Sequence, residues 1–366
     1  MPDPWLASLP DPGEGATAAF RLRADDPAWD AFVARVAPGA YAQRPAWAEV
    51  KAANGWHAER VVVDAAPGPI GAQLLIHRLG PTPWSIGYAP RGPVAARFEP
   101  AAVTAWTDAL RELARRRRLS HVVVDPAIPV GDQVADWLVA NGWRPTAQVQ
   151  PPRTRLIDLR RPEDELWADL RSKWRQYVTR ARRDGVTVVE TGPDGLDDFF
   201  RIYVETARRA GFIHRAASAY GATYAAFART GAARLLFAQG PDGSRQATLM
   251  LLACGATVVE PYGGMTAAGA TSRANYLLKW EAIRSSQAGG FTTYDLWGLA
   301  HPGIAQFKAG FGGREVEWIG AWELVARPLV RGTVTSIQRA RVALAVRRAG
   351  RDGRSGEASG GAAAAP

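Results

Sequence analysis

Residues 234–262 read RLLFAQGPDGSRQATLMLLACGATVVEPY and contain three apolar segments separated by turn residues. The turn Gly240-Pro241-Asp242-Gly243 between residues 234–239 and 246–254 predicts a β-hairpin. A further strand is predicted at 257–262, after the break at Gly255. Three consecutive strands therefore form the centre of the second half of the chain.

Helical patterns flank these strands. Apolar residues recur at helical spacing over residues 196–210 before them and over 272–288 after them. Tyr294-Asp295-Leu296-Trp297 then reads as a returning strand. Hairpin strands, a helix and a returning strand together predict a mixed α/β unit (α+β).

The first half of the chain repeats this order of elements. Its returning strand ends at Asp125, as the second ends near Asp295. Two units with the same order predict two similar domains with a cleft between them. The elements expected in the first half are a helix at 46–54, strands at 59–64, 70–79 and about 84–88, a helix at 101–118 and a strand at 121–125.

Composition shifts set the expected domain limits. The ends, 1–18 and 349–366, are rich in glycine, alanine and proline and are expected to be disordered. The first domain is expected at 19–151, completed by 317–348, and the second at 152–316.

The chain is strongly basic, with a formal net charge of +10 and a pI near 10.1. This charge favours a polyanionic partner, although part of it follows from a general preference for arginine. Of 45 basic residues only four are lysines: Lys51, Lys173, Lys279 and Lys308. A position that keeps lysine in such a chain can mark a need for a compact ammonium group.

A basic helix is predicted at 170–183, between the two units. Its apolar stripe faces a core, and its other face is basic. Such a face can lie along phosphates, or it can be a solvated helix surface; the sequence leaves both open. The basic residues that could make such phosphate contacts are Arg171, Lys173, Arg175, Arg180, Arg182 and Arg183.

Several common chemistries lack their motifs. The five histidines have no metal-site spacing, and neither a G-x-S-x-G elbow nor a P-loop is present. We therefore expect no metal and no cofactor. The single cysteine, Cys254, excludes an intramolecular disulfide, and no apolar run is long enough for a membrane helix. A cytoplasmic protein is expected.

The segment 294–322 is dense in glycine and aromatic residues and contains Lys308, which follows Phe307. A lysine beside aromatic and small residues can stay charged while partly desolvated, and it can then stabilise an oxyanion. The alternative interpretation is a surface lysine in a turn.

These residues, together with others along most of the chain, resemble the FemABX family of aminoacyl-tRNA-dependent peptidyltransferases. The helical arm that some members carry in the second domain is missing, as in the compact form. The matching positions are Gln43, Trp47 and Lys51; 88–94; Asp125-Pro126; 154–159; the basic helix with Gly185-Val186; Arg215; Tyr262; 275–280; 294–298; and 306–312.

The resemblance implies a tandem pair of GNAT-like acyltransferase domains. It implies transfer of an amino acid from aminoacyl-tRNA to the stem peptide of a peptidoglycan precursor, either lipid II or UDP-MurNAc-pentapeptide. Because the coenzyme A signature of GNAT proteins is absent, acetyl-CoA is not the expected donor. The residue roles implied are precursor phosphate binding by Lys51 and Arg215, a place in the acceptor site for Asp125 and oxyanion stabilisation by Lys308. Further substrate contacts are implied for Trp56, Tyr262 and Phe307, and the six basic residues of the helix at 170–183 become candidates for tRNA binding.

Two other functions remain open: a tRNA-dependent ligase for a peptide natural product, and an RNA-binding relative without catalysis. The presence together of Lys51, Asp125, Arg215 and Lys308 argues against the second. We further expect a monomer. Its basic C-terminal helix, at 333–348, is expected to pack on the first domain, with contact to an anionic membrane as the alternative.

Overall fold

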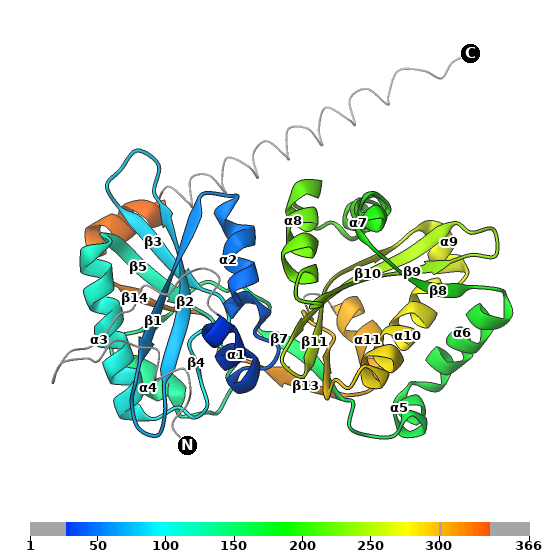
Figure 1. Cartoon of the computed structure of the whole chain (residues 1–366), viewed down its shortest axis with the longest axis horizontal. Helices are drawn as coiled ribbons and strands as arrows, with labels where there is room; N and C mark the ends of the chain where they lie inside the picture. Colours follow the sequence, from blue (N-terminus) through cyan, green and yellow to red (C-terminus); the bar gives the residue numbers. More distant parts are fainter. Residues whose placement is uncertain (1–26, 300–301, 337–366) are drawn as a thin grey trace, which may run out of the picture.

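The computed structural model describes residues 27–299 and 302–336, which form two α/β domains side by side (Figure 1). The first domain is built on a sheet with strand order β1–β2–β3–β5–β14–β6, and β4 pairs with β2. Its strands are β1 (Trp56–Val63), β2 (Ile70–Arg78), β3 (Ser85–Ala89), β4 (Val94–Ala95), β5 (Leu119–Val124), β6 (Arg144–Pro145) and β14 (Trp322–Val325). Its helices are α1 (Pro27–Val36), α2 (Pro45–Ala52), α3 (Pro100–Arg116) and α4 (Val134–Ala140), with a short 3₁₀ turn at Tyr41–Gln43.

The second domain contains the other sheet, with strand order β13–β7–β12–β11–β10–β9–β8. Its strands are β7 (Arg153–Asp158), β8 (Thr187–Thr191), β9 (Ala233–Gln239), β10 (Arg245–Cys254), β11 (Thr257–Met265), β12 (Thr293–Asp295) and β13 (Arg314–Glu317). Its helices are α5 (Glu163–Asp169), α6 (Ser172–Arg183), α7 (Leu196–Ala210), α8 (Ala217–Ala228), α9 (Ala267–Thr271), α10 (Ala274–Ala288) and α11 (Pro302–Ala309).

The two sheets share one connectivity, which confirms the repeat predicted from the sequence. In each, three antiparallel strands lead through a helix to a strand that returns parallel to the third: β3 pairs with β5, and β11 pairs with β12. The connecting helices are α3 and α10. The helix expected at 272–288 is α10, which begins two residues later because its N-cap, Arg273, takes a left-handed conformation with φ +64° after the short helix α9.

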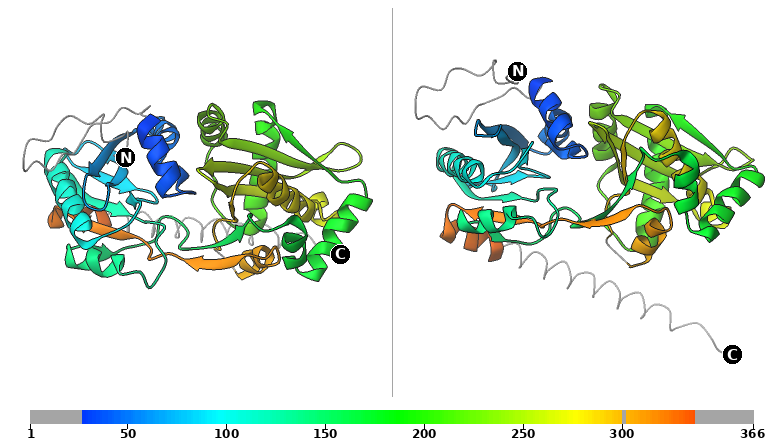
Figure 2. Two further views of the ribbon diagram at one scale, coloured as in Figure 1. Left: turned by 60° about the horizontal axis from the view of Figure 1, so that its bottom comes forward. Right: turned by 90° about the horizontal axis from the view of Figure 1, so that it is seen from below.

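The chain crosses between the domains a second time near its end. Figure 2 shows the orange segment leaving the second sheet at β13 and running along one side of the molecule into the first sheet. There β14 pairs with β5, from Trp322 opposite Val124 to Val325 opposite His121. Residues 328–336 are helical; the rest of the helix expected at 333–348 lies outside the described residues, as do 1–18 and 349–366.

Alternation along the strands buries both faces of each sheet. In the second sheet, Leu236 and Leu249 pack with α6 and α10, whereas Phe237 and Met250 pack with α7 and α8. The face of the first sheet that carries α1 and α2 shares an apolar cluster with Phe227, Leu252 and Val259 of the second domain. The domains are therefore joined by a common core. No helix in the described ranges is long and apolar enough to cross a membrane.

Candidate functional site

Lys308 lies in the last turn of α11, close to the place where the closing strand β12 ends. Its ammonium donates hydrogen bonds to the backbone carbonyl oxygens of Trp297 at 2.6 Å and Gly298 at 2.9 Å. Burial lowers the pKa of this amine to about 8. An ammonium has three N–H donors, so the described residues engage two of them and leave one for a ligand.

Asp295, at the end of β12, is a buried carboxylate that orders the same turn. It accepts hydrogen bonds from the hydroxyl of Thr154 and from the backbone N–H of Trp297, the latter at 2.7 Å. Burial raises the pKa of Asp295, while the nearby Arg91 and Lys308 oppose that shift. Asp295 was not among the site residues predicted from the sequence. Its position at the end of a closing strand, matching Asp125, was the signal available.

Asp125 occupies the equivalent position after β5 and is 2% exposed. Its carboxylate accepts from the Tyr88 hydroxyl at 2.7 Å, from the Arg91 backbone N–H at 2.6 Å and from the Gln150 backbone N–H at 3.2 Å. Burial raises the pKa of Asp125. The carboxylate that the resemblance assigned to the acceptor site therefore already accepts three hydrogen bonds from the protein.

Arg91 connects the two strand ends. Its backbone N–H binds Asp125, and its guanidinium carbon lies 4.8 Å from the ring centroid of Trp297 in the other domain. A further bond joins the guanidinium to the carbonyl oxygen of Pro151 at 2.9 Å. The ring of Tyr41 packs on Trp297 at a centroid distance of 5.5 Å. Neither Arg91 nor Tyr41 was selected from the sequence, because each contact is made across the domain boundary.

A cavity of about 280 Å³ opens at this junction. Its walls include Arg91 and Ala127 from the first domain and Asp295 and Trp297 from the second. A ligand in this cavity would touch both domains and would lie against Asp295 at the end of β12.

Lys51 and Arg215, the two predicted phosphate ligands, are brought together from different domains. Burial and, to a smaller extent, the nearby Arg215 guanidinium lower the pKa of the Lys51 amine to about 8. The Lys51 ammonium also lies 4.9 Å from the ring centroid of Trp47. Within residues 27–299 and 302–336, neither cation has a carboxylate partner. Two adjacent unpaired cations suit a phosphate or diphosphate group.

Tyr262 lies near Arg215, and the sequence did not settle whether it belongs to a strand because Pro261 precedes it. The structure places it in β11, opposite Met250. The register of this pairing shifts between Met250 and Leu252, which accommodates the proline, since proline cannot donate a ladder hydrogen bond. Burial raises the pKa of Tyr262, and the Arg215 guanidinium opposes that shift.

The other two predicted substrate contacts are partly buried in aromatic surroundings. Trp56 begins β1, and its ring packs on His77 at 4.8 Å, within the cluster that contains Tyr41. Phe307 precedes Lys308, and its ring packs edge-on against Tyr276 at 5.2 Å. The carbonyl oxygen of Phe307 accepts a hydrogen bond from the indole of Trp174 at 3.0 Å.

Most of the basic side chains of helix α6 are already bound to other groups of the protein, which its sequence did not suggest. Arg180 and Arg183 pair with Asp184 and Arg182 with Glu281, while Arg175 donates to backbone carbonyl oxygens of residues 168 and 170. The remaining two cations lie over aromatic rings: Arg171 over Trp174 at 5.2 Å, and Lys173 over Tyr177 at 5.7 Å.

Arg273, at the start of α10, joins this group. Its guanidinium carbon lies 4.6 Å from the ring centroid of Tyr177, and its Nε atom is buried without a hydrogen-bond partner among the described residues. We call Arg171, Lys173, Tyr177, Arg273 and Tyr276 the cation–aromatic patch. The patch adjoins Phe307 through Trp174 and Tyr276.

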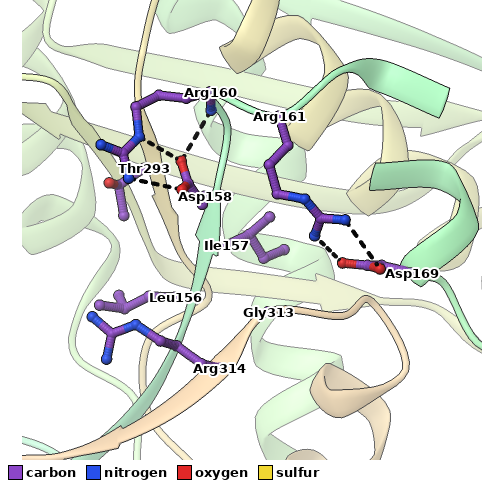
Figure 3. A pocket seen from close by; sticks show the side chains of 9 residues that line it. All are labelled: Leu156, Ile157, Asp158, Arg160, Arg161, Asp169, Thr293, Gly313 and Arg314. Carbon is purple, nitrogen blue, oxygen red and sulfur yellow. Dashed lines mark hydrogen bonds and ion pairs between the residues drawn. The ribbon is translucent and has the colours of Figure 1, made fainter. Parts of the chain in front are cut away.

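A second cavity, of about 410 Å³, lies beside β7 and is lined by three arginines (Figure 3). Two of them are already neutralised, since Arg160 binds Asp158 and Arg161 binds Asp169. Leu156 and Thr293 line both this cavity and the one at the junction. The paired arginines make this second cavity a poorer anion site than the Lys51–Arg215 pair.

Comparison with known proteins gives matches to both domains. The FemAB family model matches residues 25–136, and the model of an acetyltransferase (GNAT) domain matches residues 168–309. A lipid II:glycine glycyltransferase of Staphylococcus aureus is 29% identical over 217 residues, which are 56% of this chain and 52% of that one. The chain thus matches about half the length of these curated relatives.

Solved structures agree on the fold. The crystal structure of FemX superposes with a TM-score of 0.78 at 21% identity, covering 86% of this chain and 99% of that one. A tandem GNAT protein from the clavulanic acid biosynthesis pathway has a TM-score of 0.52 at 14% identity, covering 84% of this chain and 98% of that one. The expected tandem GNAT-like fold is confirmed.

Proposed function

We propose that this chain is an aminoacyltransferase of the FemABX family, which moves an amino acid from aminoacyl-tRNA to the stem-peptide side-chain amine of a peptidoglycan precursor; the match to the FemAB family model, the glycyltransferase relative and the FemX-like fold support this proposal. The observation that carries this proposal is the Lys308 ammonium, which is partly desolvated and bound to the carbonyl oxygens of Trp297 and Gly298, with its third donor unengaged by the described residues. The chemistry of such a group suits an oxyanion.

In the proposed reaction, the neutral acceptor amine attacks the carbonyl carbon of the aminoacyl ester. The carbonyl oxygen becomes an oxyanion, which accepts the remaining hydrogen bond from Lys308. When the carbonyl re-forms, the bond to the ribose oxygen breaks, and that oxygen takes up the proton released by the amine. The products are an amide and free tRNA. Since an ester and an amine react readily once aligned, positioning supplies most of the rate.

The Lys51–Arg215 pair is the proposed site for the phosphates of the acceptor. Both nucleotide-linked and lipid-linked precursors carry a diphosphate, and paired cations bind such a group through charge-assisted hydrogen bonds. Tyr41 lies between this pair and Lys308, so that an acceptor bound at the pair could extend toward the lysine. Its phenol is electrostatically coupled to Arg215, and its ring packs on Trp297, whose carbonyl oxygen binds Lys308.

The cation–aromatic patch is the proposed contact for the tRNA. Cations beside aromatic rings suit single-stranded nucleic acid, because rings stack on bases while the cations bind phosphates. The patch reaches Phe307, the neighbour of Lys308, so a 3′ end on it would carry its ester toward the ammonium. The proposed tRNA contact is therefore smaller than the whole basic helix. Of the six predicted cations it keeps Arg171 and Lys173, and it adds Arg273 at the start of α10.

The test is a transfer assay with a mixture of radiolabelled aminoacyl-tRNAs and, in separate reactions, lipid II and UDP-MurNAc-pentapeptide. We expect label on one of the two acceptors, with mass analysis showing one added aminoacyl residue. Labelled acetyl-CoA serves as the control donor and is expected to give no product. Transfer from acetyl-CoA, or no transfer from any charged tRNA to either acceptor, would refute the proposal.

A further inference from the structure

A buried ion pair lies beneath α11, outside the groups assigned to the reaction. Lys279 on α10 donates to one carboxylate oxygen of Glu260 on β11, and the hydroxyl of Tyr294 donates to the other oxygen at 2.8 Å. Lys279 is 2% exposed and Glu260 is 7% exposed. Removing both charges from water is costly, and apolar replacements of such pairs are often neutral or stabilising. The pair therefore calls for a role other than stability.

The ammonium of Lys279 holds the end of α11 through two aromatic rings. It lies 5.6 Å from the ring centroid of Phe307 and 5.8 Å from that of Phe311. The two rings pack edge-on against each other at 5.3 Å, and Lys308 lies between them in the sequence. Cation–π attraction of this kind strengthens when the cation is desolvated. The contacts of Lys279 with these two rings thus fix the backbone position from which the Lys308 side chain extends.

The pair also acts on the charge of Lys308. Burial is the main cause that lowers the pKa of Lys308; Glu260 raises that pKa, and Lys279 lowers it by less than Glu260 raises it. Asp295, from the end of β12, also raises it. These three groups, on β11, α10 and β12, are the charged neighbours that affect Lys308 among the described residues. The pair as a whole therefore favours the ammonium form.

We propose that Glu260 and Lys279 are positioning residues for Lys308. The pair fixes the two rings that flank the catalytic lysine and supplies a net stabilising field for its positive charge. This inference rests on the proposed function, in which the Lys308 ammonium stabilises the oxyanion.

The test uses the double variant Glu260→Gln/Lys279→Met of the full chain. It leaves no unpaired buried charge, the glutamine can still accept from Tyr294, and methionine can pack on the same rings, so the fold should be retained. Because the chain has only four lysines, the Lys308 amine can be titrated directly by NMR with isotope-labelled lysine, assigned with Lys308→Arg. We expect Lys308 to lose its proton at lower pH than in the wild type, and kcat to fall about tenfold.

A matched control is Glu323→Gln. Glu323 is also buried and paired, with Arg144 at 2.9 Å and Arg331 at 2.7 Å, but it lies on β14 in the first domain. This variant should lower the free energy of unfolding and leave the Lys308 titration unchanged. The conservative single variant Glu260→Asp should show a smaller shift than the double variant, since it keeps both charges of the pair.

Two results would separate the inference from the function on which it rests. A folded double variant with an unchanged Lys308 titration and unchanged kcat would overturn the positioning role, even if Lys308 itself proved essential. If the Lys308 titration shifts in the double variant but a separate Lys308→Met variant is fully active, the catalytic role of Lys308 is refuted instead.

Discussion

The ammonium of Lys308 lies 2.6 Å from the carbonyl oxygen of Trp297, a residue held in the left-handed region at φ +55°. Such a conformation is costly for a bulky side chain and persists where the surrounding structure imposes it. Asp295 imposes it here through its bond to the Trp297 N–H. The arrangement aims a backbone carbonyl at the lysine, so the ammonium is already held in place in the absence of substrate.

Replacing Lys308 by methionine should lower the single-turnover rate of transfer by about a hundredfold or more, because the oxyanion then has no fixed ammonium to stabilise it. The measurement is a rapid-quench assay with charged tRNA and saturating acceptor. Binding of uncharged tRNA, followed by fluorescence anisotropy, should change little and serves as the control. A full rate in the methionine variant would exclude the oxyanion role.

The pH dependence of kcat should show an alkaline limb near pH 8, because the Lys308 pKa is about 8 and only its charged form, below that pH, donates to the oxyanion. Lys308→Arg should remove this limb, since a guanidinium stays protonated throughout. Lys51 has a pKa of about 8 as well, so Lys51→Arg is the matched control. Loss of the limb in Lys51→Arg alone would assign it to acceptor binding instead.

Much of the fold follows from sequence patterns, whereas the junction between the domains does not. The hairpin of β9 and β10 and the helix α7 follow from local apolar periodicity and turn residues, which act over a few positions. Short edge elements such as β6 and β13 carry too few residues for any pattern. The bulge that admits Pro261 is set by pairing with β10, and no local signal predicts it.

Likewise, some residues of the candidate site could be predicted from the sequence and others could not. Lys308, Lys51 and Arg215 could be selected because residue type and motif mark them. Arg91 could not, since its contact with Trp297 depends on how two domains pack. The charge of α6 was overestimated because Asp184 and Glu281, which neutralise several of its arginines, lie outside the predicted helix.

Acceptor binding should be accompanied by proton uptake at pH 8 to 9. The Lys51 amine has a pKa of about 8, with Arg215 contributing to the shift, so part of it is neutral at this pH. A bound phosphate raises that pKa, and the amine then takes up a proton. Calorimetry of UDP-MurNAc-pentapeptide binding in buffers of different ionisation enthalpy measures the uptake. Lys51→Arg should abolish it, and uptake that persists in this variant would point to another group.

Lys173→Gln and Arg273→Gln should weaken tRNA binding and reduce its dependence on salt, since each removes a cation placed to neutralise a phosphate. The slope of log K against log salt should fall by about one for each phosphate that is no longer neutralised. Arg180→Gln is the matched control, because this helix α6 arginine is already paired with Asp184. Equal effects of the three substitutions would mean that the whole basic face, rather than the cation–aromatic patch, binds the tRNA.

Asp125→Asn separates two roles for the buried carboxylate. All three of its partners donate to it, so an amide would present its own N–H group to at least one donor and leave it unsatisfied. The free energy of unfolding should fall by about 1–3 kcal/mol, as measured by denaturant titration. Tyr88→Phe removes a single bond to this carboxylate and should cost about 1 kcal/mol.

The kinetics of the same variants decide whether Asp125 contacts substrate. If it only holds the Arg91 segment, the rate should fall in both variants in proportion to their loss of stability, and the KM for the acceptor should rise with it. An Asp125→Asn protein of wild-type stability with turnover abolished would show instead that the carboxylate acts on the acceptor directly. The free energy of unfolding of each variant therefore decides whether a lower rate reflects lost structure or a lost contact with the acceptor.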